Sequence, residues 1–297
     1  MEVTRTFAET RDGYDGVVGL LPTLGYLHEG HLTLMDLLRE QCDTLVVSLF
    51  VNPTQFNETQ DFDTYPRDED RDARLAEEHG ADIVFAPDVE EVYPGPSIST
   101  VEVIGVTDEM EGRHRPGHFV GVATVVAKLF AGLRPDVAMF GRKDAQQLTV
   151  LRAMTRDLRF PIDIVEAPVV REPDGLALSS RNVRLSREER YAALAISRGL
   201  FQAAEQVDAG ERRSERLEGT VGRSMKSLDI DYVKLASRET MKPIDSLDLP
   251  AVLAVAAHVG AVRLIDNVAF DLVDGRPVPD RGILLDEPSR LTALPIS

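Results

Sequence analysis

Two histidines lie three residues apart in segment 22–31, which reads PTLGYLHEGH. They are His28 and His31, and glycines at 25 and 30 let the backbone turn tightly and approach a ligand closely. The segment follows the apolar run 17–21, so it is expected where a buried strand hands over to a helix. A helix N-terminus there presents unpaired backbone N–H groups to anions. Imidazole donors at such a junction are typical of a site for phosphate charge, and they predict nucleotide binding.

Neutral polar side chains follow a second predicted strand. Asn52 and Gln55 come directly after the β-branched run 44–51. Amide groups at the carboxyl end of a strand suit a small polar substrate. An Asn-Pro turn explains Asn52 equally well, whereas Gln55 is less easily explained by a turn alone. Segment 112–119, GRHRPGHF, adds two more histidines before another predicted helix and indicates a further functional loop.

Two further segments carry cationic side chains that could bind phosphate groups. Lys143, one of only five lysines, lies between a predicted strand and a predicted helix, where an ammonium group suits a phosphate. Asp144 either caps that helix or contributes to the site. Gln147 lies one helical turn after Lys143 and can face the same ligand. Ser179, Ser180 and Arg181 form a second group able to bind phosphate oxygens.

The composition limits the function. The formal net charge of −17 argues against broad nucleic-acid binding, and it requires local cations at any phosphate site. No apolar run approaches the length of a membrane span. The single cysteine, Cys42, rules out an internal disulfide and suits a reducing cytoplasm. The acidic run 68–72 reads mainly as a solvated helix start, although one carboxylate there could assist a phosphate-bound Mg²⁺.

The elements that must position these residues alternate along the first part of the chain. Strands are expected at 17–21, 44–51, 82–85, 137–140 and 162–165, and helices at 32–39, 67–79, 120–133 and 145–158. This alternation predicts an α/β fold with a Rossmann-like parallel sheet over 1–171, whose ligands lie beyond the carboxyl ends of the strands. Helices at 186–207 and 211–228 and strands at 230–235, 251–257 and 262–265 predict a smaller α+β domain over 172–297. Residues 277–297 are expected to form an irregular tail.

The motifs of the chain are together similar to those of a known family. It resembles the pantothenate synthetases (pantoate–β-alanine ligases) of the HxGH nucleotidyltransferase superfamily. The resemblance runs through PTLGYLHEGH, SLFVNPTQF, DFDTYPRDED, RPGHFVGVATVVAKLF, FGRKDAQQL, REPDGLALSSRN and RLIDN, in that order. A single HxGH motif is moderately specific, whereas the ordered set is very specific.

The resemblance implies an ATP-dependent ligation in two steps. The carboxylate of pantoate attacks the α-phosphorus of ATP, giving pantoyl adenylate and pyrophosphate. The amine of β-alanine then attacks the activated carbonyl and releases AMP. The resemblance also implies Mg²⁺ with the nucleotide, a cytoplasmic enzyme, a homodimer, and a C-terminal domain that closes over ATP as a lid.

The resemblance also implies roles for residues. His28, His31, Lys143, Ser179 and Arg181 form the expected catalytic group, with the two histidines stabilising charge on the α-phosphate. The expected ATP contacts are Leu24, Gly25, Tyr26, Leu27, His28, Glu29, Gly30, His31, Gly141, Arg142, Lys143, Asp144, Val170, Leu178, Ser179, Ser180 and Arg181. The expected pantoate and β-alanine contacts are Gln55, Gln147, Asn52, Arg115 and His118. Asp72 matches an acidic position that helps to place Mg²⁺.

Four positions depart from the usual family pattern. Leu24 replaces a methionine, which is a mild change in volume. Arg142 stands where glutamate is usual, so its ATP contact is left open. Ala145 replaces an aromatic residue and Arg184 a tyrosine.

Two other functions are also consistent with these residues. One is a related nucleotidyltransferase that stops at a stable nucleotide conjugate, and the other is a non-catalytic nucleotide-binding protein. A dinucleotide oxidoreductase is disfavoured because no GxGxxG follows the first strand.

Overall fold

The computed structural model describes residues 1–56 and 62–291. Within them the chain forms two compact units. The first comprises 1–104, 115–140 and 150–167, and the second comprises 105–114, 141–149 and 168–297. Two short segments well before the predicted boundary at 171, together with residues 168–171, therefore belong to the second unit. The division into a binding domain and a lid stays a prediction.

A six-stranded sheet forms the centre of the first unit, in the order β1-β4-β3-β2-β5-β6. The pairings β1–β4, β4–β3, β3–β2 and β2–β5 are parallel. The strands are β1 (Glu2–Thr4), β2 (Val18–Thr23), β3 (Thr44–Leu49), β4 (Ile83–Phe85), β5 (Val137–Gly141) and β6 (Asp163–Ala167). All six residues of β3 are buried, as expected for a strand covered on both faces. The prediction of a Rossmann-like parallel sheet is confirmed.

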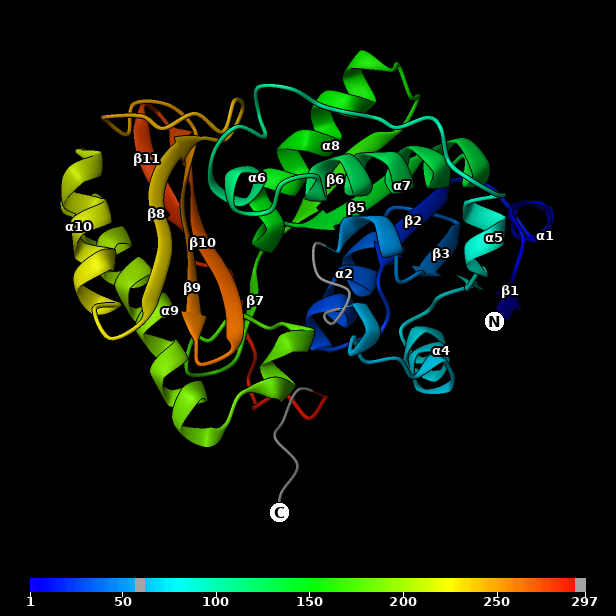
Figure 1. Ribbon diagram of the computed structural model, residues 1–297, viewed down its shortest axis with the longest axis horizontal. Coiled ribbons are helices and arrows are strands. Elements are labelled where there is room, and N and C mark those ends of the chain that lie inside the picture. Colours follow the sequence, from blue (N-terminus) through cyan, green and yellow to red (C-terminus); the bar gives the residue numbers. More distant parts are fainter. Residues whose placement is uncertain (57–61, 292–297) are drawn as a thin grey trace. The chain divides into compact units, whose positions relative to one another are not determined.

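Helices alternate with these strands along the chain (Figure 1). They are α1 (Phe7–Asp12), α2 (Glu29–Arg39), the 3-10 turn η1 (Pro53–Gln55), α4 (Glu69–Glu78), α5 (Val89–Val92), α7 (His118–Leu133) and α8 (Ala145–Asp157), whose first turn belongs to the second unit. The sequence missed the short elements β1, α1 and α5. No helix in the described part of the chain is both long and apolar enough to cross a lipid bilayer.

The edge of the sheet that carries the predicted site is fixed by register. β2 and β3 are parallel neighbours, and Thr23 pairs with Leu49 at their last residues. The backbone N–H of Phe50 continues the ladder by donating to the carbonyl of Thr23 (3.1 Å). Segments 24–31 and 50–55 therefore leave the sheet side by side at its carboxyl edge, as predicted.

An antiparallel sheet forms the second unit, in the order β11-β10-β9-β8. Its strands are β8 (Asp229–Ser237), β9 (Ala251–Val259), β10 (Val262–Val273) and β11 (Arg276–Asp280). The long helices α9 (Arg187–Asp208) and α10 (Ser214–Ser224) lie beside this sheet (Figure 1) and bury their apolar faces against it. The remaining elements are α6 (Met110–His114), the 3-10 turns η2 (Arg142–Asp144) and η3 (Ser180–Arg184), and the parallel pair β7 (Val170–Arg171) and β12 (Ile283–Leu284). The predicted α+β domain is confirmed, and a capping box of Ser186 and Glu189 starts α9.

The expectation of an irregular tail after residue 277 is wrong in part. Pro277 and Pro279 lie in β11, which pairs with β10, and the chain then forms β12. A strand with two prolines is tolerated because β11 is at the edge of its sheet, where an N–H can be missing. β10 also extends to Val273, eight residues beyond the predicted end at 265. The last six residues of the expected tail, 292–297, lie outside the described residues.

Candidate functional site

The loop of the two histidines begins with two residues in the left-handed backbone region. Gly25 has φ +78° and Tyr26 has φ +52°. The hydroxyl of Thr23, the last residue of β2, accepts a hydrogen bond from the N–H of Gly25 (3.1 Å). This turn directs the chain from the sheet edge into α2, which begins at Glu29.

Asp72 from α4 holds that turn in place. Its carboxylate accepts from the N–H groups of Tyr26 (2.5 Å) and Leu27 (2.8 Å), and it is 1% exposed. Arg71 pairs with Asp72 and donates to the carbonyl of Leu27 (2.8 Å). Burial raises the pKa of the Asp72 carboxyl, while the hydrogen bonds to Leu27 and Tyr26 oppose that rise. These contacts favour a positioning role for Asp72 over the predicted contact with Mg²⁺.

The two imidazoles cap the helix reciprocally. The N–H of Gly30 donates to Nδ1 of His28 (3.1 Å), and the N–H of His28 donates to Nδ1 of His31 (3.3 Å). The rings stack with their centroids 4.1 Å apart. Because each Nδ1 accepts a hydrogen bond, the neutral form of each ring carries its proton on Nε2. Each histidine is thus set up as an Nε2–H donor at the N-terminus of α2.

Asn52 shapes the neighbouring loop from a fully buried position. Its Oδ1 accepts from the Tyr93 hydroxyl (2.8 Å), and its Nδ2 donates to Oε1 of Gln55 (3.1 Å) and to the carbonyl of Gly121 (3.2 Å). Gly121 lies in α7, where an added Cβ would fall 2.3 Å from the carbonyl oxygen of Thr54, so only glycine allows this approach. The Asn52 side chain therefore fixes the loop that carries Gln55. A direct contact of Asn52 with substrate stays a prediction.

Arg115 and His118 hold the same loop from its other side. Nδ1 of His118 donates to the carbonyl of Gln55 (2.8 Å), and its Nε2 accepts from Nη1 of Arg115 (3.0 Å). Arg115 also reaches the carbonyl of Gln55 (3.4 Å). His118 is therefore the opposite tautomer from His28 and His31. The first unit thus brings together Asn52, Gln55, Arg115 and His118 as predicted, with three of them supporting the fourth.

In the second unit, Lys143 lies in η2. Among the described residues, no carboxylate forms an ion pair with its ammonium group. Its neighbour Arg142 pairs through Nη1 with Asp280 of β11 (2.5 Å). Asp144 is exposed, and Gln147 is partly buried on the first turn of α8.

The backbone around Lys143 is bound by Asn267 of β10. Nδ2 of Asn267 donates to the carbonyls of both Arg142 and Lys143, at 2.9 Å each. Asn267 follows Asp266, which forms a bidentate pair with the fully buried Arg171 (2.7 and 3.0 Å). The sequence singled out no role for these three residues. Their only signal was that they lie in the motifs REPDG and RLIDN, which carry the resemblance.

The Ser179–Arg181 segment is also in the second unit. Ser179 and Ser180 are buried, and Oγ of Ser179 accepts from the N–H of Arg181 (3.3 Å) at the start of η3. The carbonyl of Val170 accepts from the N–H of Leu178 (2.9 Å), which ties this segment to β7. The backbone thus joins two separate predicted ATP segments, Val170 and 178–181.

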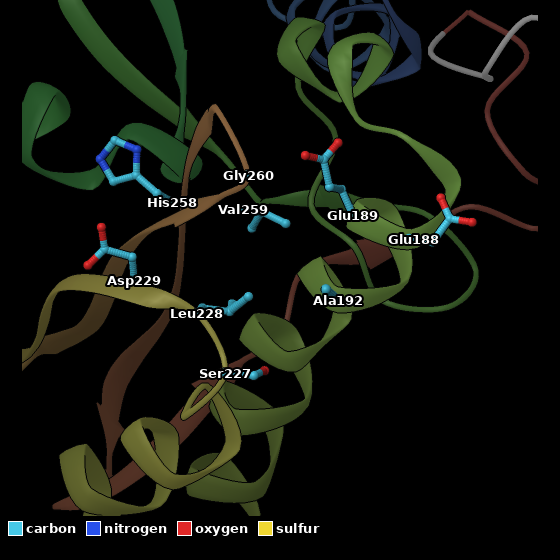
Figure 2. A pocket seen from close by; sticks show the side chains of 9 residues that line it. All are labelled: Glu188, Glu189, Ala192, Ser227, Leu228, Asp229, His258, Val259 and Gly260. Carbon is cyan, nitrogen blue, oxygen red and sulfur yellow. The ribbon is translucent and has the colours of Figure 1, made fainter.

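The second unit also contains a pocket of about 500 Å³ (Figure 2). The side chains of Glu188 and Glu189 come from α9, while Asp229 and His258 come from β8 and β9. None of the predicted site residues lines it. Among the described residues, no group of three or more histidine, cysteine or acidic side chains is arranged to hold a metal ion.

Comparisons with known proteins give a consistent result. The family model described as pantoate-beta-alanine ligase matches residues 1–269. A pantothenate synthetase from Heliobacterium modesticaldum is 50% identical over 86% of this chain and 92% of its own. Pantothenate synthetase 1 from Bradyrhizobium diazoefficiens is 51% identical over 91% of this chain and 95% of its own.

Solved structures agree with these relatives. The crystal structure of pantothenate synthetase from Thermus thermophilus is 44% identical, covers 90% of this chain and 98% of its own, and superposes with a TM-score of 0.86. The pantoate-beta-alanine ligase from Francisella tularensis, complexed with beta-gamma ATP and beta-alanine, is 29% identical. It covers 90% of this chain and 97% of its own, with a TM-score of 0.75.

Proposed function

Because the chain belongs to the pantoate–β-alanine ligase family and is an enzyme of that type, we propose that it condenses (R)-pantoate with β-alanine through pantoyl adenylate, with release of AMP and pyrophosphate. The observation that carries the mechanism is the reciprocal cap of His28 and His31. It provides two preorganised Nε2–H donors at a helix N-terminus, a place suited to developing phosphate charge.

In the first step a carboxylate oxygen of pantoate attacks the α-phosphorus of ATP. The bond from that phosphorus to the bridging oxygen breaks, and pyrophosphate leaves with the electron pair. Negative charge builds on the non-bridging oxygens of the α-phosphate, where His28 and His31 donate from Nε2. The donors need no reorganisation because the backbone already fixes both rings.

In the second step the amine of β-alanine attacks the carbonyl carbon of the adenylate. The carbon–oxygen bond to AMP breaks, and the attacking nitrogen loses a proton. The step is feasible because the phosphate has turned a carboxylate oxygen into a good leaving group. Gln55 is the proposed contact for both pantoate and β-alanine, and its backbone is held by His118.

The remaining proposed roles follow the family motifs. We propose that Lys143, Ser179 and Arg181 bind ATP phosphates, and that Gln147 binds pantoate. Arg142 pairs with Asp280, which leaves Lys143 as the proposed phosphate ligand of η2. Arg115 and His118 contribute by holding the Gln55 loop.

Mg²⁺ is proposed to enter with ATP. The acidic side chain expected to help, Asp72, has both oxygens engaged by backbone amides, so it does not fit as a metal ligand. Mg²⁺ commonly needs few protein ligands when phosphates hold it. Bound to ATP, the ion would neutralise phosphate charge, and no residue of this chain is assigned to it.

Product analysis tests the proposal. Purified protein given pantoate, β-alanine and Mg-ATP is expected to form pantothenate and AMP in equal amounts. Accumulation of a stable pantoate–nucleotide conjugate in the presence of β-alanine would instead support the rival nucleotidyltransferase. ATP binding without any pantoate-dependent turnover would support the non-catalytic rival.

Two further parts of the proposal concern the enzyme in the cell. A cytoplasmic location is supported by the single cysteine, Cys42, which leaves no partner for an internal disulfide. A homodimer is proposed from the family resemblance. Light scattering coupled to size exclusion tests it, with a mass of two chains expected and a mass of one chain contradicting it.

A further inference from the structure

We propose that Asn267 is a positioning residue for Lys143 in the adenylation step. The inference rests on the proposed function of Lys143 as a phosphate ligand. Asn267 is 2% exposed and lies on β10, far along the chain from η2. It acts through the backbone of the loop and not through contact with substrate.

The geometry shows how one side chain fixes the lysine. Nδ2 of Asn267 carries two hydrogens, and it donates one to the carbonyl of Arg142 and one to the carbonyl of Lys143, both at 2.9 Å. These carbonyls belong to the two peptide planes that flank the Cα of Lys143. Holding both planes fixes φ and ψ at Lys143, and with them the direction in which its side chain leaves the backbone.

Asn267 is itself held at both ends of its backbone. Its N–H donates to Oδ1 of Asp266 (2.7 Å), and its carbonyl accepts from Nη2 of Arg171 (2.9 Å). Arg171 uses its other donors on the Asp266 carboxylate and on the carbonyls of Gly175 and Arg281. The buried pair of Arg171 and Asp266 is therefore fully hydrogen-bonded, the condition under which a buried ion pair is tolerated.

The two carbonyl oxygens that accept from position 267 explain why this residue is an asparagine. Two carbonyl oxygens require two donors on one short, planar side chain, which asparagine supplies and aspartate does not. Leucine has a similar branched shape and no donor. Asn267→Leu would thus release both carbonyls and let the loop rotate. A displacement of about 1 Å at a charged ligand is enough to lower a rate on the order of 100-fold.

A double-mutant cycle separates positioning from general support of the fold. The assay is pantoate-dependent exchange of labelled pyrophosphate into ATP, measured below the unfolding temperature of every variant. We expect Asn267→Leu to lower the exchange rate about 10- to 100-fold in the wild-type background. In the Lys143→Met background it is expected to cost no more than about two-fold, because the side chain that it positions is gone.

Val268→Ala is the matched control, because Val268 is the next residue of β10 and is fully buried. It is expected to lower the melting temperature and to leave the exchange rate nearly unchanged in both backgrounds. An equal fold-loss from Asn267→Leu in the two backgrounds would overturn the inference. If Asn267→Leu does not fold, Asn267→Ser, whose shorter side chain has a single donor, takes its place in the cycle.

The two proposals fail in different ways. Absence of any pantoate-dependent exchange in the wild-type protein contradicts the proposed function. Normal exchange in the wild type with an additive cycle contradicts only the role of Asn267. A crystal structure of Asn267→Leu gives a direct second measurement, since an unmoved backbone at 142–144 would also overturn the inference.

Discussion

His28 and His31 are bound to each other through the backbone: the N–H of His28 donates to Nδ1 of His31 (3.3 Å), and their rings stack at a centroid distance of 4.1 Å. One set of contacts therefore caps a helix and selects the tautomer of two imidazoles. A sequence motif that looks like two separate histidines is a single structural unit. The capping contacts use the Nδ1 atoms, whereas the proposed catalytic role uses Nε2, so the two roles can be tested separately.

Replacing His28 by asparagine tests that separation. Asparagine is a good N-cap, and its Oδ1 can take the place of Nδ1, so the free energy of unfolding is expected to change by less than about 0.5 kcal/mol. The Nε2–H donor is lost, and turnover is expected to fall about 100- to 1,000-fold. Urea unfolding and steady-state kinetics of His28→Asn measure the two effects.

His79→Asn is the control, because His79 lies at the C-terminus of α4 and pairs with Asp36 (2.8 Å). It should keep wild-type turnover. Near wild-type turnover in His28→Asn would remove His28 from the mechanism.

Asp72→Asn is expected to loosen the turn before α2. An amide has one acceptor oxygen, so one of the N–H groups of Tyr26 and Leu27 loses its partner in a buried place. The free energy of unfolding should fall by about 1–3 kcal/mol, and activity should fall with it. Asp70→Asn, exposed on the same helix, is the matched control and should behave as the wild type. A stable, active Asp72→Asn would show that the turn does not depend on this carboxylate.

His118 is expected to act on the KM for pantoate through Gln55. In His118→Asn, the Asn Nδ2 can still donate to the carbonyl of Gln55, whereas His118→Ala leaves that carbonyl without this donor. We therefore expect a rise in KM of about ten-fold for His118→Ala and a clearly smaller rise for His118→Asn, with the KM for ATP little changed. Equal effects of the two substitutions would contradict the positioning role.

The acid stability of the second unit depends in part on Glu211. The side-chain hydrogen bond from Arg213 lowers the pKa of Glu211 to about 2 from its ordinary value of 4.5. Since the folded pKa lies below the unfolded one, its stabilisation is present above pH 4.5 and is lost as the pH falls towards 2. Unfolding of Glu211→Gln and wild type should therefore differ near neutral pH and converge in acid. A constant difference across that range would contradict the assignment.

The sequence predicted what depends on local pattern. The apolar runs at 17–21 and 44–51 form β2 and β3. Because these strands are parallel neighbours, the loops that follow them lie at the same edge of the sheet. Asn52 illustrates a mixed result. The sequence could not choose between a turn and a binding role, and the structure shows a fully buried amide that shapes the turn carrying Gln55.

What the sequence missed depends on partners far away in the chain. β10 continues past the predicted end at 265 through Asp266 and Asn267, two residue types that are uncommon in strands. They are tolerated there because Arg171 satisfies the carboxylate and η2 uses the amide. β11 was missed because prolines at 277 and 279 suggest a loop, and only its place at the sheet edge permits them. The positioning role proposed for Asn267 could not be predicted from the sequence, because it depends on contacts between β10 and η2, which are far apart in the chain.

Pantoate-dependent exchange of labelled pyrophosphate into ATP, in the absence of β-alanine, is the measurement that most directly detects the proposed adenylate. Rapid exchange that requires pantoate and Mg²⁺ is expected, because in the proposed route the adenylate forms reversibly before the amine binds. His28→Asn is expected to lower this rate as much as it lowers overall turnover. No exchange without β-alanine, in a protein that still makes pantothenate, would contradict the adenylate route and the role given to the two histidines.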